Sequence, residues 1–390
     1  MLTSSGKVAF VTGVNGISGN AIVELLIRQP RSEWSRIVVT SRSPLANYWE
    51  DPRVEFIALD FLSPVEDLIR KLTPVCKGVT HAYFTSYVHT NDFATLKEYN
   101  APLFENFLTA IDAVAGSSLE RVCLQTGAKH YGCHLGPIPV PMSEEHPRYD
   151  DKGLNFYYLQ EDALFSLHKK RQWKWNVIRP SGIIGFTPAG NGMAHALSFA
   201  LYFLTCRELG EMPVFPGNKF SYNVIDNQSA ASGLADMTLW ATTQEHTANE
   251  AFNHVNGDIF SYHELFPKIG AYFGVKVEDP EFAVLGESHD HVENEYAMSQ
   301  WAKDKQPVWE QITKKYGGNP EAFGWGTWQT MDWAMGKSWP ACLSISKARK
   351  FGWTRYDDTY DTWVDTFRAF ENAGILPRRQ ALLESAGVKP

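Results

Sequence analysis

The groups in this sequence that could carry out chemistry are, first, a phenol and an ammonium. Tyr157 lies in a segment that predicts a helix, and a lysine four residues later would share its face, lower the pKa of the phenol and let the hydroxyl act as an acid. The residue at that position is Glu161, so this arrangement is broken. Lys129, just past a predicted strand, could supply the cation instead. Two alternatives stay open. Tyr158 could act as the acid, because one helical step turns it by about 100°, or the site could be inactive, with a surface lysine and a buried tyrosine.

A glycine-rich turn near the first residue is the second feature with chemical meaning. The segment Val8–Gly19 predicts a strand, a turn with three glycines and the start of a helix. Gly13 permits a tight turn, Gly16 lets the backbone approach a pyrophosphate, and Gly19 lets the helix lie close to the strand. The N–H groups at the start of the helix would bind the phosphates. This pattern predicts a dinucleotide site, and the alternative is a turn that is merely tight.

The end of the second predicted strand indicates which dinucleotide binds. It continues into Ser41, Arg42 and Ser43, with no carboxylate that would hydrogen-bond a ribose 2′-hydroxyl. A guanidinium and a hydroxyl suit a 2′-phosphate, so we predict NADP(H) rather than NAD, unless Arg42 is simply a solvated surface residue. Asp60 ends the third strand where an adenine amino group would lie, and it could equally serve as a turn carboxylate.

Alternating strands and helices must position these groups. Strands are predicted over residues 8–12, 37–40, 54–59, 81–85, 121–125, 175–178 and 251–254. Helices are predicted over residues 20–28, 65–72, 95–114 and 157–170. Strands separated by such helices form right-handed βαβ units of a parallel, doubly wound sheet. Ser63, Pro64 and Glu66 predict a capping box at the start of the helix over 65–72.

The composition is that of an ordinary globular protein. The chain has 390 residues, of which 44% are hydrophobic and 21% charged, and its formal net charge is −8. This negative charge argues against nucleic acid and anionic membranes as partners, and no apolar stretch reaches the ~20 residues of a membrane span. Five cysteines without a C-x-x-C pair favour reduced thiols and the cytoplasm.

Three motifs together resemble those of a known family. They are Gln125-Thr-Gly-x-Lys129-His-Tyr131, Asn155-Phe-Tyr-Tyr-x-x-Glu-Asp162 and Arg179-Pro-x-x-Ile-x-Gly185. Together with Asn256-Gly-Asp258 and the segment Lys303–Trp309, they make the sequence similar over nearly its whole length to the progesterone 5β-reductase and iridoid synthase family of extended short-chain dehydrogenases. In that family the first tyrosine of the pair and the lysine of the first motif are catalytic. These residues correspond to Tyr157 and Lys129.

The resemblance implies an α/β protein with a Rossmann doubly wound sheet. The NADP-binding domain would cover residues 1–187 and about 215–258, and a smaller, mostly helical substrate lobe would cover residues 188–214 and 259–390. The expected cofactor contacts come from the turns after the strands. They are Thr12, Gly13, Gly16, Ile17, Gly19, Ser41, Arg42, Ser43, Asp60, Phe61, Thr85, Lys129, Tyr157, Pro180 and Ile183.

The activity implied by the resemblance is NADPH-dependent 1,4-reduction of an enone or enal. Tyr157 would hold the charge that develops on the carbonyl oxygen, while Lys129 polarises that hydroxyl or contacts the cofactor ribose. The expected partner is a lipophilic small molecule, and a homodimer is an option by analogy with the fold. Carbonyl reduction, epimerisation, cyclisation and a non-catalytic NADP-binding regulator remain alternatives.

Several features depart from the family or lie outside these motifs. Short-chain dehydrogenases in general usually carry a serine at the end of the strand, where this sequence has Gly127. Two features depart from the family itself: Ser43 stands where relatives often have a second arginine, and the loop Cys133–Leu154 is somewhat shorter than in the plant members, so no particular substrate is carried over. His289-Asp-His291 lacks a third ligand nearby, so we expect no metal. The segment Trp301–Trp339 holds six of the thirteen tryptophans and predicts either the core of the small lobe or the walls of an apolar pocket.

Overall fold

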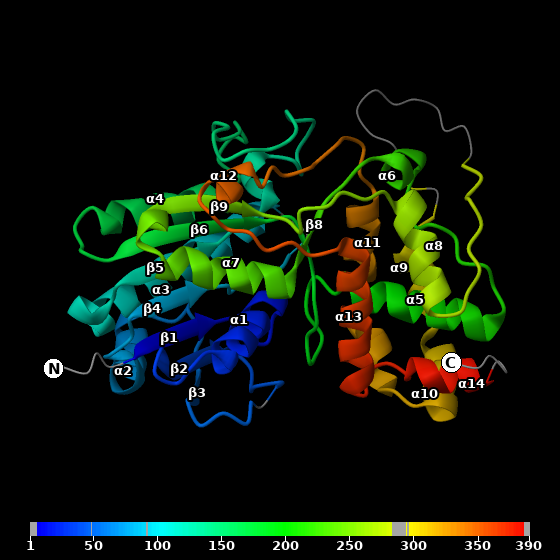
Figure 1. Cartoon of the computed structure of the whole chain (residues 1–390), viewed down its shortest axis with the longest axis horizontal. Coiled ribbons are helices and arrows are strands. Elements are labelled where there is room, and N and C mark those ends of the chain that lie inside the picture. Colours follow the sequence, from blue (N-terminus) through cyan, green and yellow to red (C-terminus); the bar gives the residue numbers. More distant parts are fainter. Residues whose placement is uncertain (1–5, 48, 91–92, 283–293, 295, 386–390) are drawn as a thin grey trace. The chain divides into compact units, whose positions relative to one another are not determined.

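Seven parallel strands form the main sheet, in the order β3-β2-β1-β4-β5-β6-β9 (Figure 1). The strands are β1 (Lys7–Thr12), β2 (Trp34–Ser41), β3 (Val54–Ala58), β4 (His81–Phe84), β5 (Arg121–Gln125), β6 (Lys174–Pro180) and β9 (Glu250–His254). The order reverses beside β1, so the sheet is doubly wound and its carboxyl-terminal edge has a switch point between β1 and β4. The predicted Rossmann-type sheet is confirmed.

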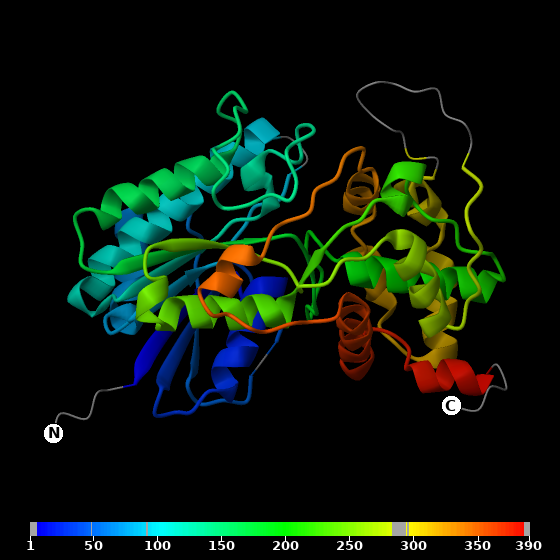
Figure 2. The same cartoon turned by 45° about the horizontal axis from the view of Figure 1, so that its top comes forward.

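Helices cover both faces of this sheet (Figure 2). They are α1 (Ile17–Arg28) and α7 (Ala231–Thr243) on one face, and α2 (Val65–Cys76), α3 (Phe93–Ala115) and α4 (Phe156–His168) on the other. The strands are apolar runs because both faces are buried, as Phe10 and Val11 on β1 show, each with none of its surface exposed. Phe84, Phe104 and Phe107 fill the layer between the sheet and α3.

The start of α2 differs from the sequence prediction. Its N-cap is Pro64, which has no hydrogen-bonding side chain, and the Ser63 N–H donates instead to the carbonyl of Asp60. Ser63 is therefore part of the preceding turn rather than a cap. The predicted capping box is wrong, because the turn ends one residue later than the sequence pattern indicates.

The chain divides into two compact units within the described residues, which are 6–47, 49–90, 93–282, 294 and 296–385 of this computed structural model. The first unit spans residues 1–182, 231–255 and 343–355, and the second spans 183–230, 256–342 and 356–390. The returning segment thus begins at 231 rather than about 215, and a second return, 343–355, was not foreseen. This second return contains α12 (Ser346–Lys350) and joins the first unit because the Ser344 N–H donates to Met142 O and Trp353 Nε1 donates to Asp236.

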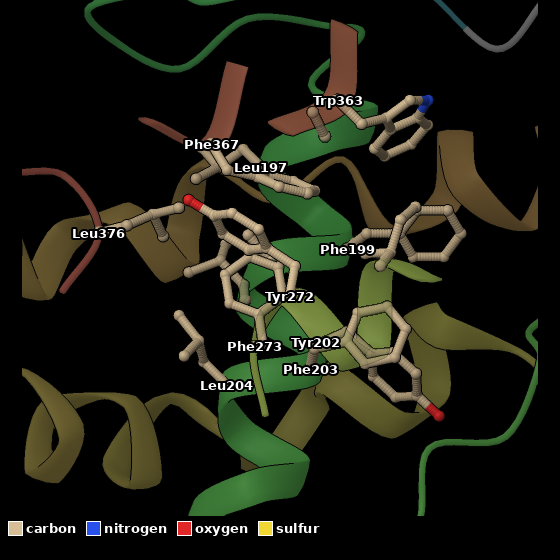
Figure 3. Close-up of a cluster of buried hydrophobic side chains, with 14 of the residues drawn as sticks. Leu197, Phe199, Tyr202, Phe203, Leu204, Tyr272, Phe273, Trp363, Phe367 and Leu376 are labelled. Carbon is tan, nitrogen blue, oxygen red and sulfur yellow. The ribbon is translucent and has the colours of Figure 1, made fainter. Parts of the chain in front are cut away.

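The second unit is mostly helical, as the sequence predicted. Its longer helices are α5 (His195–Leu209), α8 (Tyr262–Tyr272), α10 (Gln306–Tyr316) and α13 (Thr359–Asn372). The shorter elements are β7 (Gly182–Ile184), β8 (Gln228–Ala230), α6 (Lys219–Asn223), α9 (Met298–Trp301), α11 (Trp328–Met335) and α14 (Arg379–Ser385). Side chains of α5, α8 and α13 pack around Phe199 and Phe203 (Figure 3). Trp309 is fully buried in this core, and Trp301, Trp325 and Trp328 pack against it, so these four belong to the core of the unit.

Candidate active site

The glycine turn after β1 is built for close backbone approach. Gly13 has φ +65°, and a Cβ at that position would lie 2.9 Å from Thr85 O. A Cβ on Gly19 would lie 2.4 Å from Gly13 O, so only glycine allows α1 to pack this closely on the turn. The N-cap of α1 is Gly16, which has no side chain to bond the first N–H groups of the helix. These groups are therefore available for phosphate oxygens.

Two threonines join the ends of β1 and β4 at the switch point. The Thr85 N–H donates to Thr12 Oγ1 over 3.1 Å, and Thr85 Oγ1 donates to Thr12 O over 2.6 Å. Both residues were predicted to contact the cofactor, and both lie at the edge where a dinucleotide binds in this kind of sheet. Their observed bonds hold the two strand ends together.

Asn15 organises the loop that carries Arg42, a role that no pattern in the sequence indicated. Its amide nitrogen lies 3.2 Å from the hydroxyl oxygens of both Ser41 and Ser43, and its carbonyl oxygen accepts from Ala46 N over 3.0 Å. The glycine turn and the loop after β2 are thereby connected. Arg42 lies exposed in this loop, next to the glycine turn that would hold the pyrophosphate.

The residues after β3 take part in a turn and in the core. Asp60 Oδ1 accepts a hydrogen bond from Leu62 N over 3.0 Å, so Asp60 acts as a turn carboxylate. The ring of Phe61 is 3% exposed and packs at right angles on Phe107, with centroids 5.5 Å apart. Only the backbone of Phe61 could reach a cofactor, because its side chain belongs to the core.

Tyr157 lies in the first turn of α4, next to the end of β5. A Cβ on Gly127 would lie 3.4 Å from Tyr157 Oη and 3.5 Å from Pro180 O. The position that usually carries a serine therefore lies beside the phenol, but here it has no hydroxyl. Ile17 is buried at the start of α1, whereas Ile183, the last of the predicted cofactor residues, belongs to β7 of the second unit.

The environment of Tyr157 keeps its hydroxyl protonated. Burial raises its pKa above the ordinary value, and the nearby Tyr87 and Cys133 act in the same direction. The phenol is consequently a hydrogen-bond donor rather than a phenolate. Tyr87, which lies after β4, was missed because nothing in its local sequence distinguishes it.

Tyr158 does not offer a second free phenol. Its hydroxyl donates to His130 O and accepts a hydrogen bond from Tyr149 N over 2.9 Å. The guanidinium of Arg148 lies 4.8 Å from the centre of its ring. Of the two tyrosines left open by the sequence, Tyr158 thus has a structural role in this arrangement.

Lys129 lies in the short 3₁₀ helix Ala128–Tyr131, directly after Gly127. Burial lowers the pKa of its ammonium group, and Cys133 acts in the opposite direction. Its carbonyl oxygen accepts a hydrogen bond from Asn155 Nδ2 over 2.7 Å. Asn155 is also the N-cap of α4, since its Oδ1 accepts from Tyr157 N over 3.2 Å. An asparagine directly before a helical segment is a signal that could have identified this cap.

Glu161, at the position where a lysine was expected, is buried and paired. Its carboxylate lies 2.9 Å from Arg179 Nη2, 3.2 Å from His130 Nδ1 and 3.3 Å from Arg148 Nη2. Burial acts to raise its pKa, but His130 and the charge on Arg179 outweigh burial and lower the pKa to about 2. Glu161 therefore remains a carboxylate at neutral pH and cannot act as a proton donor.

The sequence also raised the questions of a metal site, of disulfides and of a membrane span. Within the described residues, no cluster of three His, Cys, Asp or Glu side chains could hold a metal ion. His289, Asp290 and His291 lie outside the described residues. None of the five cysteines, all of them described, forms a disulfide bond. None of the helices in the described part of the chain has both the length and the apolar character to cross a bilayer.

A family model described as a PRISE-like Rossmann-fold domain matches residues 9–324. The chain belongs to this family. This is the family that the motifs around Lys129, Tyr157 and Arg179 indicated, so the resemblance found in the sequence is confirmed. The chain is an oxidoreductase of the short-chain dehydrogenase/reductase superfamily.

Three relatives align with almost the whole chain. The short chain dehydrogenase gsfE of Penicillium aethiopicum is 42% identical over 95% of this chain and 100% of its own length. An (S)-8-oxocitronellyl enol synthase of Nepeta racemosa and a 3-oxo-Delta(4,5)-steroid 5-beta-reductase of Arabidopsis thaliana are each 30% identical, over 94% of this chain and 92% of their own. Enone reduction is thus an activity of this family.

A solved structure shows the same fold at low sequence identity. The enzyme WbmH of Bordetella bronchiseptica, in complex with NAD+, has a TM-score of 0.63 and 14% identity, and the match covers 95% of this chain and 100% of that one. This similarity confirms the Rossmann-type architecture of the PRISE-like chain.

Proposed function

We propose that this protein reduces the C=C bond of an activated, fairly lipophilic α,β-unsaturated carbonyl compound with NADPH. The observation that carries the proposal is the protonated hydroxyl of Tyr157 beside Gly127, at the sheet edge that also bears the glycine turn. The steroid 5-beta-reductase among the relatives supports it, because its name describes reduction of a 3-oxo-Delta(4,5) compound, which is an enone.

The residues at the sheet edge fit NADP(H). The N–H groups at the start of α1 would hold the pyrophosphate, and the loop that Asn15 ties to the glycine turn would present Arg42 and Ser43 to the 2′-phosphate. Bound there, the reduced nicotinamide supplies a hydride to the β-carbon of the enone. Lys129 would either polarise the Tyr157 hydroxyl or contact the cofactor ribose.

Tyr157 would stabilise the product of that addition. As a hydride reaches the β-carbon, negative charge develops on the carbonyl oxygen, and the Tyr157 hydroxyl would donate a hydrogen bond to it. The enolate would then take a proton from water at its α-carbon, which gives the saturated carbonyl compound. A preorganised donor of this kind contributes about 3–4 kcal/mol to transition-state stability. Because burial raises the pKa of Tyr157, the phenol keeps its proton and remains available as a donor over the neutral and mildly alkaline range.

The test is NADPH consumption with a panel of enones and enals, each paired with its saturated carbonyl compound. We expect loss of NADPH absorbance with the unsaturated members and formation of the saturated carbonyl product. Oxidation of NADPH with the saturated carbonyl compounds would indicate carbonyl reduction instead. Tight NADPH binding with no consumption by any member would contradict the proposal and favour a regulator.

The preference for NADPH should depend on Arg42. We expect Arg42→Ala to weaken NADPH binding by about 10–100-fold and to leave NADH binding unchanged, because a charge-assisted bond to phosphate contributes about 1.5–3 kcal/mol. Fluorescence titration with both cofactors would measure this change. Arg70→Ala, which removes an exposed arginine of α2, is the matched control. An equal loss for both cofactors would remove Arg42 from this role.

Turnover should fall as the pH rises through the pKa of Lys129. Burial lowers this pKa from its ordinary 10.5 and raises that of Tyr157, so the lysine loses its proton first. Activity that needs the ammonium is complete below the pKa of Lys129 and is lost above it. In Lys129→Arg the alkaline limb of kcat/KM should move to higher pH, since guanidinium stays charged beyond pH ~12. An unmoved limb in this variant would assign the titration to another group.

A further inference from the structure

Two side chains from the start of helix α4 donate hydrogen bonds to backbone carbonyl groups in the segment around Lys129. Asn155 Nδ2 donates to the carbonyl of Lys129 over 2.7 Å, and Tyr158 Oη donates to the carbonyl of the next residue, His130. Asn155 also caps the helix through Tyr157 N. The helix that carries the Tyr157 phenol is thus hydrogen-bonded to the backbone carbonyl groups of Lys129 and of His130.

Glu161 adds a third contact, to the side chain of His130. The imidazole is 3% exposed, its Nδ1 lies 3.2 Å from Glu161 Oε1, and its ring packs at right angles on the ring of Tyr158 with centroids 5.2 Å apart. Arg179, at the end of β6, binds the same carboxylate oxygen over 2.9 Å. The His130 side chain is therefore held between α4 and the sheet.

We propose that Asn155, Tyr158 and Glu161 are positioning residues that fix Lys129 relative to Tyr157. This inference rests on the proposed function. Where a lysine follows the tyrosine by four residues, one helix sets the distance between the two groups. Here Tyr157 and Lys129 lie on different elements, so tertiary contacts must set the distance between them. Glu161 occupies the position four residues after Tyr157 and anchors the separate segment that carries the cation.

The first test replaces Tyr158 by Phe. This change removes the hydrogen bond to His130 O and keeps the ring that packs on the imidazole. We expect kcat for enone reduction to fall about 10–100-fold, since a displacement of about 1 Å in a catalytic group can cost that much. KM for the enone should change by less than about threefold, because Tyr158 would not touch the substrate.

Tyr202→Phe is the matched control for stability. Tyr202 Oη likewise donates to one backbone carbonyl, Val214 O, over 2.9 Å, and accepts from one backbone amide, Val214 N, over 2.8 Å, within the second unit. The two variants should lower the unfolding temperature by similar amounts. Only Tyr158→Phe should lower kcat. Equal kcat values in the two variants, or a fall in both, would overturn the proposal.

The second test does not depend on turnover. Trace acetylation followed by peptide mass spectrometry measures the reactivity of the Lys129 amine in the full chain. Tyr158→Phe and Asn155→Ser, the latter retaining a capping residue, should each increase labelling of Lys129 several-fold, while Tyr202→Phe should not. Unchanged labelling in both variants would overturn the positioning role. A wild-type protein that reduces no enone would contradict the proposed function alone. The positioning of Lys129 would still be tested, because labelling does not require turnover.

Discussion

Tyr157→Phe is expected to lower kcat for enone reduction by about 10²–10³-fold, the loss measured when one donor to a developing oxyanion is removed. The substitution deletes a single oxygen atom next to Gly127 and leaves the ring, which is 8% exposed and packs on Phe156 with centroids 4.6 Å apart. NADPH binding should stay within about twofold, because the hydroxyl acts on the substrate. Steady-state kinetics and cofactor titration on the same preparation would measure both quantities.

Tyr272→Phe provides a control for this experiment. Its hydroxyl donates to Glu371 Oε1 over 2.8 Å in the second unit, far along the chain from the proposed chemistry, and its loss should leave kcat unchanged. If Tyr157→Phe kept wild-type turnover, the phenol would have no part in the reaction. If NADPH binding fell together with kcat, Tyr157 would act on the cofactor rather than on the carbonyl oxygen.

Gly19→Ala is expected to weaken NADPH binding at least tenfold and to destabilise the protein by about 1–3 kcal/mol, the usual cost of overpacking a tight contact. The new Cβ would lie 2.4 Å from Gly13 O and 2.8 Å from Val14 Cα. Both are backbone atoms, so a side-chain rotation cannot relieve the overlap. The start of α1 must then move away from the turn, and its N–H groups move with it. Titration with NADPH and thermal unfolding would measure the two effects.

Gly78→Ala is the matched control, because a Cβ at that position has no neighbour within 4 Å. We expect its unfolding temperature and cofactor affinity to match those of the wild type. A Gly19→Ala protein that bound NADPH with wild-type affinity would show that the glycine turn does not hold the pyrophosphate.

Local patterns predicted much of the fold because they depend on near neighbours. The apolar runs of β1 and β5 and the glycines at positions 13, 16 and 19 each describe a few consecutive residues, and the strands they predict are present. Patterns that depend on a single residue at the boundary of a helix predicted the structure less accurately. Ser63 has the residue type of a cap, yet it completes the turn begun at Asp60, because the helix starts one position later.

Contacts between distant residues were not predictable from such patterns. The return of residues 343–355 to the first unit depends on Trp353 bonding Asp236 and on Ser344 bonding Met142, pairs separated by more than a hundred positions. The contacts of two further residues also connect distant parts of the sequence. The amide of Asn15 joins two loops, and Tyr87 influences the pKa of Tyr157. Their roles come from their neighbours in space.

The sequence alone predicted the parallel sheet and the glycine turn after its first strand, and its motifs identified the family and predicted Tyr157 and Lys129 as the catalytic pair. Only the tertiary structure showed that the Tyr157 hydroxyl lies beside Gly127, that the Tyr158 hydroxyl is bonded to His130 O, and that Glu161 is buried and paired with Arg179. The physical reason is that a sequence motif specifies residue types along one element. Protonation and hydrogen bonding, in contrast, depend on burial and on partners that other elements supply.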